Sequence, residues 1–155
     1  GIVAGLVVIT PGAGYVDSYA AVAYGIIGGM VCNLASKVKL RLNYDDTMDV
    51  FAVHGVGGFI GNILTSIFAD KDIVLLSGDE IPGGAINGNF IQILIQLSSF
   101  AGMFYSFVIT LIILYIMKTI MRVDQNFDLR LTNNAELEGT DKTEHGESAY
   151  CFDDL

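Results

Sequence analysis

Apolar residues occur along this chain in four stretches that are separated by polar segments. The first covers residues 1 to 10 and is followed by Pro11-Gly12, a pair that favours a turn. Three longer stretches cover residues 18 to 36, 50 to 69 and 90 to 117. A helix needs about 20 largely apolar residues to cross a hydrocarbon core of ~30 Å. The pattern therefore predicts an all-α, polytopic transmembrane helical bundle with three full spans and part of a fourth.

The last apolar stretch is longer than a bilayer core requires. At ~1.5 Å per residue, a helix over residues 90 to 117 would reach ~42 Å. We therefore expect this span to tilt, to kink or to protrude into the interface.

The polar segments predict how the spans are oriented. Residues 70 to 89 contain a single cation, Lys71, whereas Lys118 and Arg122 follow the last span. Residues 37 to 49 carry three cations, namely Lys37, Lys39 and Arg41. Lysine and arginine concentrate in short loops that stay in the cytoplasm. We therefore expect residues 37 to 49 and the C-terminus to be cytoplasmic and residues 70 to 89 to be external.

Composition supports a membrane protein with an acidic tail. The chain has 155 residues, of which 52% are hydrophobic and 16% charged, and its mean hydropathy is +0.55. Nine of its acids lie within residues 122 to 155, so most of the net charge of −9 belongs to the tail. We divide the chain into a transmembrane region, 1–122, and an acidic cytoplasmic regulatory tail, 123–155. The sequence contains no basic patch of the kind that binds nucleic acid, so we expect no nucleic-acid partner.

Other classes of protein find little support in the sequence. Cys32 and Cys151 have neither zinc-site nor disulfide-framework spacing, so we expect two free thiols. No Ser/His/Asp set, P-loop or HExxH motif is present, which predicts no enzyme, no cofactor and no metal site. The chain begins at Gly1 inside an apolar stretch without a charged n-region, so we expect a C-terminal fragment rather than a signal peptide.

His54 is the strongest candidate for a functional side chain. It is the one ionisable residue between residues 50 and 69, and such residues inside a span usually face a cavity or a polar partner. Burial disfavours the cation, so we expect a neutral imidazole that both donates and accepts a hydrogen bond. The only other histidine, His145, lies in the tail. A pore or relay role and a structural role between two helices both stay open, and we favour the pore.

Residues around His54 suggest support for its helix. Asp45, Asp46 and Asp49 precede the span, where carboxylates can cap free N–H groups and oppose the positive end of the helix dipole. A role for Asp46 or Asp49 in attracting cations is the alternative. Small residues recur as GxxxG pairs at Gly25/Gly29 and Gly57/Gly61, which allow close helix packing. Three glycines could instead leave room for a narrow passage beside His54, namely Gly55, Gly57 and Gly58.

Several segments resemble the C-terminal part of an ammonium transporter of the Amt/Mep family. GIVAGLVVITPGAGYV (1–16) is similar to a stretch ending in a threonine-proline turn, and DDTMDVFAVHGVGGFIGN (45–62) to the segment with the second of two pore histidines. The region around Gln92 and Gln96 matches more weakly. ELEGTDKTEHGESAY (136–150) is similar to the cytoplasmic tail motif. The resembling segments cover nearly the whole chain in the family's order.

The resemblance implies a function and an assembly. His54 would correspond to the second histidine of a pair that lines a mostly hydrophobic conduit, with its partner on an earlier helix. Ammonium would lose its proton before neutral ammonia passes, because a bare cation is costly in an apolar constriction. The family implies a multi-pass protein of the plasma membrane, a homotrimer in the lipid bilayer, and ammonium or ammonia as substrate.

The resemblance also implies regulation by the tail. In the family this segment packs on the cytoplasmic face and contacts the neighbouring subunit. Thr143 would be a phosphorylation candidate, because a phosphate beside Asp141 and Glu144 would add like charge. An ammonium sensor that signals through the tail with little flux is the alternative function. A scaffold role with a structural His54 is a third.

Overall fold

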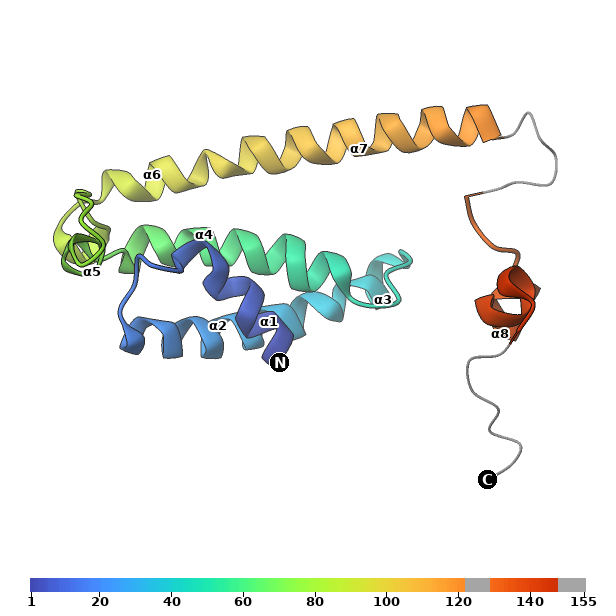
Figure 1. Cartoon of the computed structure of the whole chain (residues 1–155), viewed down its shortest axis with the longest axis horizontal. Coiled ribbons are helices and arrows are strands. Elements are labelled where there is room, and N and C mark those ends of the chain that lie inside the picture. The colour runs from blue at the N-terminus through green and yellow to red at the C-terminus, as the bar shows by residue number, and fades with distance from the viewer. Residues whose placement is uncertain (122–128, 148–155) are drawn as a thin grey trace, which may run out of the picture. The chain divides into compact units, whose positions relative to one another are not determined.

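The structure is a computed structural model that describes residues 1–121 and 129–147, and these residues form helices and connecting turns without strands (Figure 1). The chain divides into two units, Gly1–Phe104 and Tyr105–Leu155, which are described separately below. Three described helical segments are long and apolar enough to cross a membrane, Ser18–Leu42, Phe51–Phe68 and Ile91–Met121. The predicted all-α transmembrane fold is therefore confirmed.

The described residues form eight α-helices. Their bounds are α1 Ile2–Ile9, α2 Ser18–Ser36, α3 Val38–Leu42, α4 Gly57–Phe68, α5 Lys71–Leu75, α6 Ile91–Leu97, α7 Ser99–Met121 and α8 Asn133–Glu138. A π-helical segment, Phe51–Val56, leads directly into α4, and a second one covers Asp141–His145. Single 3-10 turns cover Thr10–Gly12 and Ala85–Asn87.

Val8 of α1 is the centre of the packing between α1, α2 and α4. Its side chain is fully buried, in a core with Ala4, Tyr24, Cys32 and Leu64. Glycines bring the neighbouring helices up to it, since a Cβ on Gly28 would lie 2.6 Å from Val8 Cγ2. A Cβ on Gly61 would collide with the Val8 carbonyl oxygen. Close helix contact through small residues, the usual device in lipid, therefore fixes α1 between α2 and α4.

The two glycine pairs that were expected from spacing differ in how closely they approach neighbouring helices. Gly57 and Gly61 of α4 both face neighbouring helices, and a Cβ on Gly57 would lie 3.2 Å from Cys32 Sγ. A Cβ on Gly25 or Gly29 would instead meet nothing within 4 Å. Within the described residues, Gly28 rather than the Gly25/Gly29 pair is the close-packing glycine of α2.

The loop after α4 is tied back onto the end of that helix. Asp70 N–H donates to the Tyr15 carbonyl at 2.8 Å, and Gly84 N–H donates to the Ala69 carbonyl at 2.7 Å. A Cβ on Gly84 would lie 2.7 Å from the Ser66 carbonyl oxygen, so only glycine allows this approach. These contacts therefore hold the loop in place over the end of α4.

The last long apolar stretch is interrupted at Ser98. The helix α6 ends at Leu97 and α7 begins at Ser99, while Ser98 Oγ donates to the Ile95 carbonyl at 2.6 Å. A serine hydroxyl that bonds back to the helix competes with the backbone pattern and commonly bends a helix. This region is fastened to α4, since Asn62 Nδ2 donates to Ser99 Oγ at 3.1 Å.

The described part of the tail, residues 129–147, has local helical structure although its composition resembles that of disordered segments. Thr132 Oγ1 accepts the Ala135 N–H at 3.3 Å and so caps α8. Gly139 ends this helix with φ of +98°, a conformation that favours glycine. Arg122 and Cys151 lie outside the described residues, so what was predicted for them stays a prediction.

Candidate functional site

His54 lies in the π-helical segment that precedes α4. Phe51–Val56 is wound as a π-helix, and Gly57 continues it as a regular α-helix. Short π-helical turns are rare and occur frequently at functional sites. The sequence predicted one continuous helix over residues 50 to 69 and gave no sign of this change in winding.

Asp46 holds the start of this segment. Its Oδ1 accepts the Val50 N–H at 2.8 Å, and its Oδ2 accepts the Phe51 N–H at 3.1 Å. Both amides belong to the first turn, where N–H groups lack partners within the helix. The carboxylate also opposes the positive end of the helix dipole.

Asp49 acts differently, because it pairs with a lysine from the preceding helix. Lys39 Nζ lies 2.8 Å from Asp49 Oδ1 and donates to the Asp46 carbonyl at 2.7 Å. Asp49 has a φ of +56°, an unusual conformation for a residue other than glycine. Lys39 thus bridges α3 to the turn that introduces His54.

The three glycines near His54 have different surroundings. Gly57 faces Cys32 and Val8, so it is a packing glycine. A Cβ on Gly55 would lie 3.1 Å from the Phe51 ring, which makes Gly55 a site of contact within the segment. A Cβ on Gly58 would meet nothing within 4 Å. Of the three, only Gly58 leaves open space, and it lies one helical turn after His54.

The His54 side chain itself is exposed, so the burial that was expected for it is not found within the described residues. None of the residues in 1–121 and 129–147 makes a hydrogen bond to its imidazole. The buried residues of this helix, among them Leu64 and Thr65, lie further along the chain in α4. The partner of His54 and its place in a pore therefore stay predictions.

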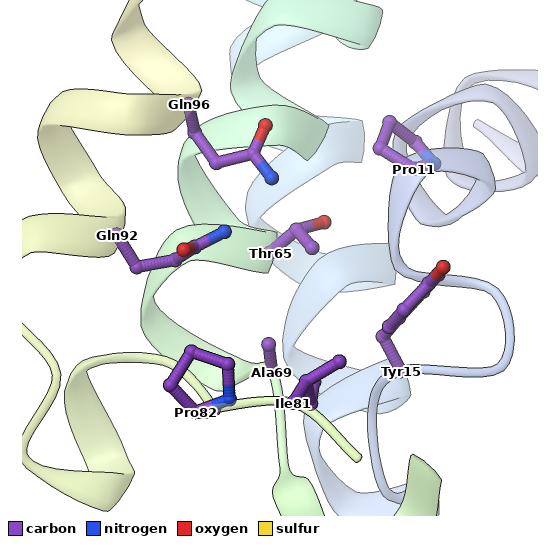
Figure 2. A pocket seen from close by; sticks show the side chains of 9 residues that line it. Pro11, Tyr15, Thr65, Ala69, Ile81, Pro82, Gln92 and Gln96 are labelled. Carbon is purple, nitrogen blue, oxygen red and sulfur yellow. The ribbon is translucent and has the colours of Figure 1, made fainter. Parts of the chain in front are cut away.

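A second polar region is a cavity at the end of α4 that the loop covers, which we call the glutamine cavity (Figure 2). Its volume is about 330 Å³. It is lined by Pro11, Tyr15, Thr65, Ala69, Ile81, Pro82, Gly83, Gln92 and Gln96. Figure 2 shows the Gln92 and Gln96 side chains extending from α6 toward Thr65 of α4.

Thr65 joins the wall of this cavity to the buried core. Its hydroxyl donates to the Gly61 carbonyl at 2.9 Å and accepts the Tyr24 hydroxyl proton at 2.9 Å. Tyr24 is fully buried, and its ring lies 6.2 Å from that of Phe68. The sequence drew attention to Gln92 and Gln96 only through a weak resemblance. Two glutamines four residues apart in an apolar span were the signal for a polar face.

Thr143 lies in the described part of the tail, within the π-helical segment Asp141–His145. Its side chain is half-buried, and Oγ1 donates to the Gly139 carbonyl at 3.0 Å. The hydroxyl is therefore already used in holding the turn that follows α8.

The described residues contain no group of three or more His, Cys, Asp or Glu side chains that could hold a metal ion. Cys32 is a free thiol and is buried against the core.

A comparison with known proteins decides the family. The model of the Ammonium Transporter Family matches residues 1–150. The chain belongs to the ammonium transporter family. Members of this family are transporters rather than enzymes, in agreement with the absence of an enzyme motif.

Individual members of the ammonium transporter family match over nearly the whole chain. Ammonium transporter 1 of Schizosaccharomyces pombe is 43% identical over 157 residues, which cover 99% of this chain and 31% of that protein. Ammonium transporter MEP2 of Saccharomyces cerevisiae is 40% identical over 154 residues, or 97% of this chain and 30% of that protein. The chain thus spans about a third of the length of these relatives.

Solved ammonium transporters share the fold. The crystal structure of Candida albicans Mep2 is similar with a TM-score of 0.76 and 44% identity, covering 85% of this chain and 28% of that one. The crystal structure of Saccharomyces cerevisiae Mep2 gives a TM-score of 0.71 and 39% identity, covering 86% of this chain and 30% of that one.

Proposed function

We propose that the full-length protein carrying this segment is a channel-like ammonium transporter. In this proposal ammonium or ammonia crosses the membrane through a hydrophobic pore that is lined by a histidine pair, of which His54 is one member. The observation that supports it best is an exposed imidazole on a π-helical turn inside an apolar span of this family.

The chemistry of the imidazole suits such a pore. Neutral histidine both donates and accepts a hydrogen bond, so it can take a proton on one nitrogen and release one from the other. Moving a bare cation through an apolar constriction is costly, whereas neutral ammonia crosses it more readily. The open space at Gly58, one turn along the helix, leaves room for a small molecule beside the ring.

The supporting residues hold the ring in place. Asp46 fixes the first turn of the π-helical segment, and the Lys39–Asp49 ion pair fixes the chain before it. A pore needs its lining groups held by rigid elements, because a shift of about 1 Å in a functional group can abolish its effect. These acids therefore position His54 and do not themselves bind substrate.

The assembly and orientation belong to the same proposal. The full-length protein is a homotrimer of the plasma membrane, its C-terminus is cytoplasmic, and the tail contacts the neighbouring subunit. Charge supports this orientation, because Lys39 and Arg41 lie in α3 on the side proposed as cytoplasmic. Lys118, in the last turn of α7, agrees with it.

The test is uptake of methylammonium, an ammonium analogue, by cells that express the full-length protein or its His54→Ala variant. We expect His54→Ala to abolish uptake or to alter its ion selectivity. His145→Ala is the matched control, because it removes the other histidine of this chain, in the tail. Unchanged uptake and selectivity in His54→Ala would assign His54 to packing. Signalling without measurable flux in the parent would favour the sensor.

A further inference from the structure

We propose that the glutamine cavity is a binding site for a small monovalent cation with N–H donors, of the ammonium class. The site is separate from His54, because Thr65 lies eleven positions further along the same helix, roughly 16 Å at 1.5 Å per residue. The existence of the site is independent of the proposed transport function. The identity of its natural cation rests on that function.

The lining offers oxygen atoms without a charged side chain. Four polar side chains line the cavity, namely Tyr15, Thr65, Gln92 and Gln96, and the remaining lining residues are apolar or glycine. Amide and hydroxyl oxygens are hard ligands that accept N–H hydrogen bonds and hold a weakly charged cation. A neutral lining lets such an ion leave again, as a transport pathway requires.

The side chains of the two glutamines have no hydrogen-bond partner among the described residues. Both are half-buried on one face of α6, and no residue in the described ranges makes a hydrogen bond to either amide. Both side chains keep part of their surface open to the cavity, and a polar group that is withdrawn from water without a partner is costly. Their neighbours on α6, Leu94 and Ile95, are exposed instead. The amides therefore face the cavity for a hydrogen-bonding occupant rather than for contact with lipid.

Thr65 can take part only as an acceptor. It is 4% exposed, its proton is committed to the Gly61 carbonyl, and one lone pair receives the Tyr24 hydroxyl. One lone pair of a hydroxyl oxygen remains. The wall near Thr65 therefore favours a donor such as N–H over an anion.

Hydrogen bonds within the covering loop fix the conformation of the wall that it contributes to the cavity. Asn89 Nδ2 donates to the Gly83 carbonyl at 2.9 Å, and the Lys71 N–H donates to Asn87 Oδ1 at 3.2 Å. Gly83 has a φ of +74°, and a Cβ there would collide with the Asn87 side chain. Together with the contacts of Gly84 on α4, these bonds fix Ile81, Pro82 and Gly83 as one wall.

The charge of the loop favours a cation over an anion or a neutral solute. Residues 70 to 89 carry four acids against one lysine, a net charge of −3, and the acids are Asp70, Asp72, Asp79 and Glu80. Asp70 and Glu80 adjoin the lining residues Ala69 and Ile81 in the chain, and the negative field of acids beside a low-dielectric cavity raises the local concentration of cations. No acid lines the cavity itself, so the field recruits cations without trapping them.

The test uses the full-length protein and two independent measurements. Thallium(I), a monovalent cation of similar size to ammonium, is soaked into crystals, and its anomalous signal is sought among Gln92, Gln96 and Thr65. Methylammonium uptake is measured in parallel for the double variant Gln92→Leu/Gln96→Leu. Leucine has a similar volume to glutamine but no hydrogen-bonding group. Asn62→Leu is the matched control, because Asn62 bonds Ser99 beside α6 but does not line the cavity.

We expect a thallium peak in the parent and in Asn62→Leu, and none in the double variant. We also expect KM for methylammonium to rise about tenfold in the double variant at unchanged maximal rate, from the loss of two hydrogen bonds. If the double variant does not fold, Gln92→Glu decides: the added negative charge should strengthen the peak and lower KM.

Three outcomes would overturn the proposal. These are a parent without a thallium peak, a double variant with the KM of the parent, and an equal rise of KM in Asn62→Leu. A thallium peak in a parent that takes up no methylammonium would keep the site and reject the transport function.

Discussion

The substitution Gly61→Ala tests whether α1 and α4 are held together by contact between their backbones. The added Cβ would overlap the Val8 carbonyl oxygen and lie 3.1 Å from two ring atoms of Pro11. Neither group is the free end of a flexible side chain. One of the two helices must therefore shift to admit the methyl group.

The magnitude follows from two opposing terms. Overpacking at a well-packed contact costs about 1–3 kcal/mol. Replacing a helical glycine by alanine contributes about 0.5–1 kcal/mol in the other direction. We therefore predict that Gly61→Ala lowers the free energy of unfolding by about 1–2 kcal/mol. Gly58→Ala, where the Cβ meets nothing within 4 Å, keeps only the favourable term.

The assay is thermal unfolding of the full-length protein in detergent, followed by methylammonium uptake in cells at matched protein amounts. Gly61→Ala should melt below the parent, and Gly58→Ala at or above it. In the uptake assay the order should reverse, because a methyl group at Gly58 enters the open space one turn from His54. The two glycines, one turn apart on one helix, would then have separate roles.

Equal melting temperatures for Gly61→Ala and the parent would refute the proposed contact between α1 and α4. A loss of stability shared by both variants would show that the helix tolerates no side chain at either position, and the contrast between packed and open faces would then be wrong.

Three further predictions concern single hydrogen bonds or charges. Tyr24→Phe removes the hydroxyl that donates to Thr65 in the core, so the free energy of unfolding should fall by about 1 kcal/mol in a thermal melt, whereas the exposed Tyr19→Phe should change nothing. Asp46→Ala leaves the Val50 and Phe51 N–H groups without their acceptor and should cost about 1 kcal/mol, while Asp46→Asn, which keeps one side-chain oxygen, should melt closer to the parent. Thr143→Asp removes the hydroxyl bond to Gly139 and adds charge beside Asp141 and Glu144, so uptake by the full-length protein should fall, whereas Thr143→Ser should transport normally. Normal uptake by Thr143→Asp would argue against control through this residue.

The spans were predictable from the sequence because length and hydropathy act locally. Residues 18 to 36 and 50 to 69 were expected as spans, and helices occupy both regions. The long third stretch was expected to be distorted, and the break lies at Ser98. Its position depends on one hydroxyl bonding back to the helix, a choice that periodicity does not specify.

The packing residues were less predictable because they depend on partners far away in the chain. Spacing favoured Gly25 and Gly29, yet Gly28 is the glycine that Val8 contacts. The position at which α1 crosses α2 decides which glycine of α2 contacts Val8. The sequence of α2 alone does not contain that information. The glutamine cavity needs the loop at Pro82 to fold back over α4, which is likewise a tertiary event.

The last span differs from its neighbours in what keeps it in the membrane. The helix α7 has no buried residue, whereas α4 has five, and α4 also carries polar groups such as Asn62 and Thr65. A helix with such an apolar surface can insert into lipid by itself, before it contacts any other helix of the protein. A helix with polar side chains becomes stable there only after it finds partners for them. The stability of α4 in a membrane therefore depends on its contacts with α1 and α2, which are synthesised before it, whereas α7 can insert without such contacts.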